Sequence, residues 1–180
     1  MRYKDIVSNS WKAHGHEIDY HEGITPDTLD QGYRKLNFGK KMAGRNKGRD
    51  FTETEKAVWY SHLMMWDIAA RKASPLIVIE HDVIQLKPVD MSKIEQYPCL
   101  GICHCGMLSN KPEKGYRISA GGAYILTPDI GKKLVDNLPS TIETNSDGYL
   151  YRTLSRYGAF DHHVSTQLWI PEWGGTIAHD

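Results

Sequence analysis

The stretch SPLIVIEHDVIQLKP, residues 74–88, is the most informative part of the sequence for the fold. Its apolar run at 76–79 leads directly into Glu80, His81 and Asp82. A short, continuously apolar run is typical of a strand that is covered on both faces, as in parallel sheets. We therefore expect a buried central strand here, with polar residues at its carboxyl end.

Two carboxylates at the end of a strand indicate a metal site. Successive side chains alternate between the faces of a strand, so Glu80 and Asp82 are predicted to point one way and His81 the other. Carboxylate oxygens suit hard cations such as Mg²⁺ or Mn²⁺, and α/β proteins bind ligands at the carboxyl edge of a parallel sheet. The alternative is that the strand end is polar only because a turn begins there.

The rest of the chain alternates predicted helices and strands, which favours an α/β fold with a largely parallel sheet. Thr52 and Glu55 form a T-x-x-E capping box at the start of the strongest helix pattern. Further candidate N-caps are Thr25, Thr127 and either Asn145 or Ser146. The predicted helices span 3–14, 25–36, 51–73, 128–139 and 145–158, and the predicted strands span 16–21, 75–80, 99–107 and 121–127.

One face of the 51–73 helix carries an apolar stripe that includes polar residues. The stripe consists of Val58, His62, Met65 and Ala69, with Ser61 and Ile68 beside it. A serine and a histidine on such a face need hydrogen-bond partners, because burying unpaired polar groups is costly.

Composition gives broad limits. The 180 residues suffice for one domain, residues 1–180, and the 22 basic residues balance the 22 acidic ones, so net charge indicates neither a nucleic-acid nor a membrane partner. No apolar run reaches the length of about 20 residues that a membrane span needs, and the start lacks the apolar core of a signal peptide. Three cysteines are an odd number for a disulfide framework. We expect a cytoplasmic protein.

Three segments together resemble glycosyltransferase family 25, which contains the lipopolysaccharide-type and collagen galactosyltransferases. FTETEKAVWYSHLMMWDIA is similar to the family's E-x5-SH-x3-W helix, PLIVIEHDVIQ to its ALILEDDV strand, and ISAGGAYILTPDIGKKLV to its SGTxxYLI-x-P-x-GA-x-x-L strand and helix. Their order and spacing agree across residues 51–138. The matching positions are Glu55, Ser61, His62, Trp66, Glu80 and Asp82.

The resemblance implies a GT-A-like nucleotide-diphospho-sugar transferase fold, with a mixed, mostly parallel central sheet flanked by helices. It implies Mn²⁺ or Mg²⁺ on Glu80 and Asp82, bridging the diphosphate of a nucleotide-sugar donor, which we expect to be UDP-linked. His179 is a candidate further metal ligand; a solvated chain end is the alternative. Family members invert the anomeric configuration of the transferred sugar, so a carboxylate base for the acceptor hydroxyl is expected. Asp147 is the candidate, unless it only complements the dipole of its helix.

Four more residues are candidates for the donor site. Ser61 and His62 are expected to position phosphate or the carboxylates, or else to make hydrogen bonds to backbone within the core. Gly121 and Gly122 either let the backbone approach the sugar closely or mark a bulge. The expected acceptor is a hydroxyl on a glycan, a protein or modified DNA.

Two departures from the family support a rival reading. His81 replaces the middle Asp of the family's E-D-D, and the sequence starts in what resembles the helix after the usual first strand, so that strand is expected to be missing. A degenerate member that binds sugar, nucleic acid or a protein partner without transfer is the alternative. Zinc binding by the CLGICHCGM segment, residues 99–107, is disfavoured against a buried strand.

A basic loop and an aromatic tail are further candidates. The loop at 38–51 carries five cations before its first acid and is a candidate cover for donor phosphates or a nucleic-acid contact, although nucleic acid is the less favoured partner. Trp169 and Trp173 are candidate sugar-stacking faces or ordinary core residues.

Overall fold

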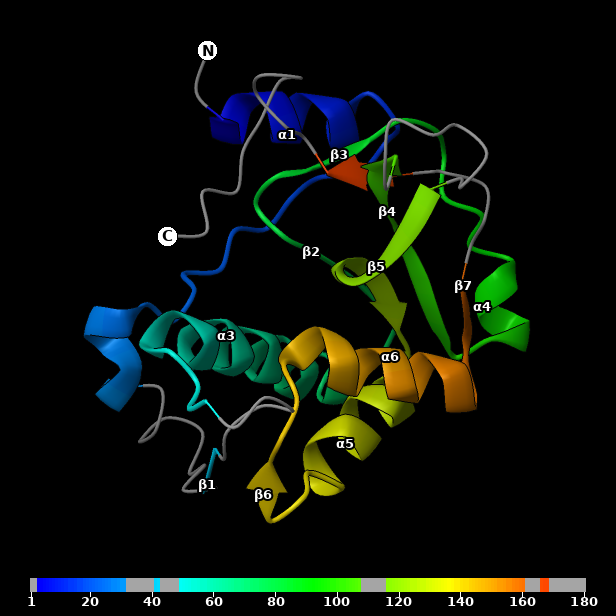
Figure 1. Cartoon of the computed structure of the whole chain (residues 1–180). Helices are drawn as coiled ribbons and strands as arrows, with labels where there is room; N and C mark the ends of the chain where they lie inside the picture. Colours follow the sequence, from blue (N-terminus) through cyan, green and yellow to red (C-terminus); the bar gives the residue numbers. More distant parts are fainter. Residues whose placement is uncertain (1–2, 32–40, 43–48, 108–115, 161–165, 169–180) are drawn as a thin grey trace.

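A computed structural model describes residues 3–31, 41–42, 49–107, 116–160 and 166–168 (Figure 1). Its helices are α1 (Tyr3–Lys12), η1 (Pro26–Thr28), α3 (Glu53–Ala70), α4 (Lys93–Gln96), α5 (Pro128–Asp136) and α6 (Ser146–Tyr157). Its strands are β1 (Lys41–Met42), β2 (Leu76–Ile79), β3 (Val83–Gln85), β4 (Cys99–Met107), β5 (Tyr116–Leu126), β6 (Thr141–Ile142), β7 (Ala159–Phe160) and β8 (Thr166–Leu168).

The expected α/β class is confirmed, but the prediction of a mostly parallel sheet is wrong. The main sheet has the order β2-β5-β4-β8-β3, with β7 also paired to β4. The β2–β5, β5–β4 and β3–β8 pairs are antiparallel, and β4 is parallel only to the short strands β7 and β8. The cause is local: β4 and β5 are consecutive among the described strands and pair directly with each other in antiparallel fashion.

Strand β2 is a strand as predicted, but it is not central. It lies at the edge of the described sheet and pairs there only with β5. Of its four residues Val78 alone is buried. The segment at 16–21 forms no strand, contrary to the prediction.

Two apolar cores lie on opposite faces of the sheet, because successive residues of β5 point to opposite sides. Tyr124 and Leu126 join a cluster with α3, α5 and α6. Ala123 and Ile125 join a second cluster with α1 and β3. Figure 1 shows the same layers, with α1 above the strands and α3, α5 and α6 below them.

Most predicted helix starts are confirmed. Thr52 and Glu55 make both hydrogen bonds of the capping box of α3. The Asn145 side chain accepts a hydrogen bond from the backbone N–H of Gly148, which starts α6. The helix predicted at 25–36 starts at Pro26 as a 3-10 turn, and most of its second half lies outside the described residues. None of the described helices combines the length and apolar character that crossing a bilayer requires.

Candidate active site

Helix α3 brings His62 to the end of β2. The His62 side chain is buried, and its ring makes two hydrogen bonds: Nδ1 lies 2.9 Å from the Tyr124 hydroxyl and Nε2 lies 3.2 Å from Oε1 of Glu80. The Tyr124 hydroxyl also accepts a hydrogen bond of 3.0 Å from Nε1 of Trp66. One chain of hydrogen bonds therefore leads from the core indole to the carboxylate at the strand end.

The directions of these bonds follow from the donors available. Trp66 can only donate, and burial holds the pKa of Tyr124 well above its ordinary value, so the phenol keeps its proton. If that proton goes to Nδ1 of His62, Nε2 carries the ring proton and donates it to Glu80. Each donor in this series of hydrogen bonds then has an acceptor. A proton on Nδ1 would instead leave the buried hydroxyl proton of Tyr124 without this acceptor. We assign His62 the Nε2–H tautomer.

Residues 80–83 form a turn rather than an extension of β2. The backbone N–H of Glu80 donates to the carbonyl of Gly122 at 2.8 Å, and the N–H of Val83 donates to the carbonyl of Glu80 at 3.2 Å. Strand alternation therefore does not apply beyond Ile79, and the extended backbone that the prediction assumed is absent from this turn. Glu80 is half-buried, His81 is exposed, and only 2% of Asp82 is exposed.

Asp147 approaches the same place from the first turn of α6. Its carboxylate lies against Gly121, so closely that a Cβ on residue 121 would lie 2.1 Å from Oδ1 of Asp147. The two predicted glycines lie where the β4–β5 register shifts: Gly101 pairs with Tyr124, but Cys103, two residues on, pairs with Ser119. The group that approaches the backbone of Gly121 is a carboxylate of the protein itself, and the role of the two glycines at a sugar stays a prediction.

Three potential metal ligands meet at this point. One ligand atom each of His62, Glu80 and Asp147 lies within 4.8 Å of the other two. We call these three residues the acidic cluster. Two carboxylates this close repel each other unless a cation or a shared proton lies between them. Carboxylate oxygens with an imidazole nearby suit Mn²⁺ or Mg²⁺, so the donor set fits the cation that the sequence analysis predicts.

Asp82 was expected to share the cation with Glu80, but it is not a member of the acidic cluster. His81, the residue that departs from the family's motif, is exposed and is not a member either. His179 lies outside the described residues, as do Trp169, Trp173 and most of the basic loop. These remain predictions.

Ser61 is held by the chain that follows α1. Its Oγ accepts a hydrogen bond of 2.9 Å from the backbone N–H of Ile24 and lies 3.0 Å from the Ala57 carbonyl, to which it donates. A bond to backbone was the alternative to a donor-site role, and it is the arrangement observed. Ser61 thereby ties the backbone of Ile24 to α3.

A cavity of about 790 Å³ opens beside the acidic cluster. Segment 16–23 forms one wall and β2 forms another, ending in Glu80 and His81. The third wall is α3, which contributes Thr54, Val58, Ser61, His62, Met65, Ile68 and other residues. The stripe seen in the sequence of this helix therefore faces largely a cavity. Figure 1 shows the blue segment running from α1 towards the helical turn η1.

Tyr124 is the member of the hydrogen-bond chain that sequence reasoning missed. It is the one polar side chain in the Ala-Tyr-Ile-Leu run of a predicted buried strand. A buried phenol normally has a hydrogen-bond partner, so this position pointed to a polar contact in the core. Its partner on α3 could not be identified without the three-dimensional arrangement.

A large cavity with a few polar side chains at one end is the usual form of a small-molecule site in an α/β domain. Residues 2–96 match the model of glycosyltransferase family 25, described as LPS biosynthesis protein. The chain belongs to this family and is a glycosyltransferase, an enzyme that uses a sugar donor and an acceptor. No curated protein and no solved structure matched the chain.

Proposed function

We propose that the chain is a metal-dependent, inverting glycosyltransferase that moves a sugar from a UDP-linked donor to an acceptor hydroxyl. The observation that carries the proposal is the acidic cluster of His62, Glu80 and Asp147, two members of which, His62 and Glu80, line the 790 Å³ cavity. The volume lies within the range of about 300–1,000 Å³ that is usual for small-molecule sites. A nucleotide sugar would place its diphosphate at the cluster and its nucleoside in the cavity.

Glu80 and Asp147 would hold the cation. A bound cation stabilises the negative charge that grows on the departing nucleoside diphosphate. Glu80 is well placed for this role, because the N–H of His62 holds one of its carboxylate oxygens at 3.2 Å and so orients the group at the end of β2. This makes His62 a positioning residue in our proposal, since its Nε2 donates to Glu80 instead of binding the ion.

Asp147 has a second candidate role as the base that removes the proton from the acceptor hydroxyl. A base of this kind must reach the hydroxyl, and Asp147 lies at the amino end of α6, where the helix dipole favours its ionised form. Geometry favours the metal role, since the carboxylate lies within 4.8 Å of its partners in the cluster. The rival reading, a degenerate member of the family, gains no support from His81, which lies outside the cluster.

Calorimetric titration of UDP with and without Mn²⁺ tests the proposal directly. We expect binding that depends on Mn²⁺ and that Glu80→Gln removes. A panel of nucleotide sugars, assayed for hydrolysis and for transfer to simple glycosides, then identifies the donor. Binding of UDP that is equally strong without the metal would contradict the metal-dependent mechanism, and a panel without turnover would favour the degenerate member.

A further inference from the structure

A second cavity, of about 410 Å³, lies between α5, β6 and α6. Its floor contains Trp59, Leu134 and Ile142, and its rim contains side chains from both helices. We call it the α5–α6 cavity. It shares no lining residue with the 790 Å³ cavity.

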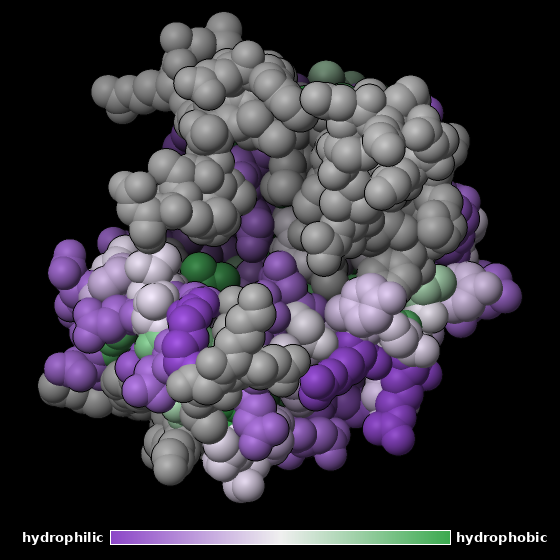
Figure 2. Space-filling model, viewed as in Figure 1, coloured by the Kyte–Doolittle hydropathy of each residue, from purple (hydrophilic) through white to green (hydrophobic). Residues whose placement is uncertain are grey.

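The rim of the α5–α6 cavity is strongly cationic. Lys133, Arg152 and Arg156 line it, and Glu143 is the single carboxylate among the lining residues. Within the described part of the chain, none of the three cations has a carboxylate partner. The adjacent Lys132 differs, because it forms an ion pair with Asp136. Figure 2 shows strongly hydrophilic surface over α5 and α6 on this side of the molecule.

The spacing of the two arginines is mildly unfavourable without a ligand. Arg152 and Arg156 are four residues apart on α6, so they lie on one face of the helix, where like charges repel. Lys133 lies close to Arg156, because both cations lie near the ring of Tyr157. The ring centroid is 5.1 Å from Nζ of Lys133 and 5.7 Å from Cζ of Arg156. An anion between these groups would relieve the repulsion.

The remaining lining residues favour an organic ligand over a simple ion. Tyr149 and Tyr157 provide aromatic surface, and Asn137, Thr141 and Thr153 provide polar groups for hydrogen bonds. The volume exceeds the need of a lone phosphate and lies in the lower part of the range usual for small-molecule sites, about 300–1,000 Å³.

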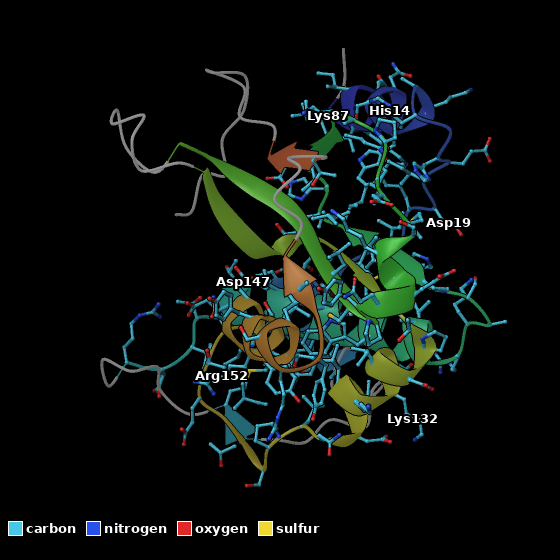
Figure 3. The ribbon with its side chains drawn as sticks, turned by 90° about the vertical axis from the view of Figure 1, so that its right-hand side faces the viewer. His14, Asp19, Lys87, Lys132, Asp147 and Arg152 are labelled. Carbon is cyan, nitrogen blue, oxygen red and sulfur yellow. The ribbon has the colours of Figure 1, made fainter. Side chains whose placement is uncertain are left out.

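This cavity is separate from the acidic cluster although α6 contributes to both. Asp147 approaches Gly121 of the sheet, whereas Arg152 lines the cavity on the side of β6. In Figure 3 the two labelled side chains lie on different sides of the orange helix.

We propose that the α5–α6 cavity binds a small phosphomonoester, with the guanidinium groups of Arg152 and Arg156 on the phosphate and the tyrosines against its organic part. Guanidinium groups match phosphate oxygens in pairs, which fits two arginines on one helix face. A sugar phosphate and a nucleoside monophosphate share this chemistry.

Calorimetric titration with four probes tests the site: inorganic phosphate, glucose 6-phosphate, uridine monophosphate and glucose. We expect glucose 6-phosphate or uridine monophosphate to bind more tightly than phosphate, and glucose not to bind. The stronger of the two organic probes identifies the source of the phosphate. The absence of binding by every phosphate-bearing probe at about 10 mM would overturn the proposal, because even weak specific sites saturate there.

Variants separate this site from the donor site. The Arg152→Gln/Arg156→Gln double variant should weaken the organic phosphate at least roughly tenfold, since it removes the charged donors. The charge-matched control Lys87→Gln/Lys132→Gln removes two exposed cations that do not line the cavity and should leave binding unchanged. Both substituted arginines are exposed, so the fold should persist; if the double variant does not fold, Arg152→Gln alone serves the same purpose.

Glu80→Gln distinguishes failure of this proposal from failure of the proposed function. Binding in the α5–α6 cavity should survive that substitution. A phosphate probe whose binding disappears in Glu80→Gln and persists in the arginine double variant occupies the donor site, and that result would overturn the second site.

Discussion

The carboxylate of Asp147 occupies the space that a side chain on Gly121 would take, since a Cβ there would lie 2.1 Å from Oδ1. Glycine at 121 is therefore a condition for the acidic cluster. Gly121→Ala should displace Asp147 and lower transferase activity by about tenfold or more, because misplacing a reacting group by about 1 Å can cost about a hundredfold. Steady-state kinetics would measure this. Gly15→Ala is the control: it has open space around its Cβ, and normal activity is expected despite its positive φ of 84°.

Asp147→Asn tests which role this residue has. Loss of Mn²⁺-dependent UDP binding is expected if the carboxylate holds the cation, whereas a base would leave that binding intact and lower kcat alone. Asp129→Asn is a matched control, because Asp129 is likewise in the first turn of its helix, α5. If both substitutions lower stability by the same small amount and activity stays normal, Asp147 only complements the dipole of its helix.

Tyr124→Phe removes one hydroxyl from the hydrogen-bond chain and leaves Nε1 of Trp66 and Nδ1 of His62 without that partner. Each buried group left unsatisfied costs about 1–3 kcal/mol, so unfolding in urea should show a loss of stability in that range or above. His62 would also lose the contact that fixes its tautomer, and a weaker response to Mn²⁺ should follow. Tyr97→Phe removes a phenol with no hydrogen bond in the described structure and should change neither quantity.

Gly131 allows α5 to cross α3 closely. A Cβ at this position would lie 2.7 Å from the backbone nitrogen of Ala70 and 2.8 Å from the carbonyl oxygen of Trp66. Both atoms are backbone and cannot move aside by a rotamer change, so Gly131→Ala should lose about 1–3 kcal/mol of stability despite the better helix propensity of alanine. Chemical denaturation measures this loss. In Lys132→Ala, the neighbouring exposed position, stability should stay within about 0.5 kcal/mol of the parent.

Stability should fall at alkaline pH through Cys99. Burial raises the pKa of its thiol to about 12, above its ordinary value of 9.0. Between these values the unfolded chain releases the proton and the folded chain keeps it, so the free energy of unfolding falls by up to about 1.4 kcal/mol for each pH unit. Burial raises the pKa of Tyr124 as well, which acts in the same direction at higher pH. Cys99→Ala should flatten the decline between pH 9 and 11; an unchanged slope would contradict it.

The sequence predicted helices better than sheet order. Capping residues such as Thr52 and Asn145 act on their own chain neighbours, so their effect can be read locally. The apolar run of β2 predicted a strand but not its position in the sheet, because an edge strand differs from a central one only in the strands that pair with it. Family resemblance supplied the class, and it is confirmed.

The candidate site was predictable in composition but not in arrangement. Three of the proposed residues, His62, Glu80 and Asp147, meet in space. Asp82 does not join them, because a turn at 80–83 replaced the extended backbone on which the alternation argument depended. The contact of Asp147 with Gly121 joins residues far apart in sequence, and only the packing of α6 on β5 creates it.

The register between β2 and β5 determines the distance between the two carboxylates of the acidic cluster. Ile79 pairs with Ala123, and the next backbone hydrogen bond joins Glu80 to Gly122. The same two strands therefore position Glu80 and the space at Gly121 that Asp147 fills. A slip of this register by one residue would send side chains of β2 to the opposite face. Insertions or deletions in either strand should therefore be far more damaging to the reaction than most single substitutions, since they change the distance between the two carboxylates while leaving every residue of the site present.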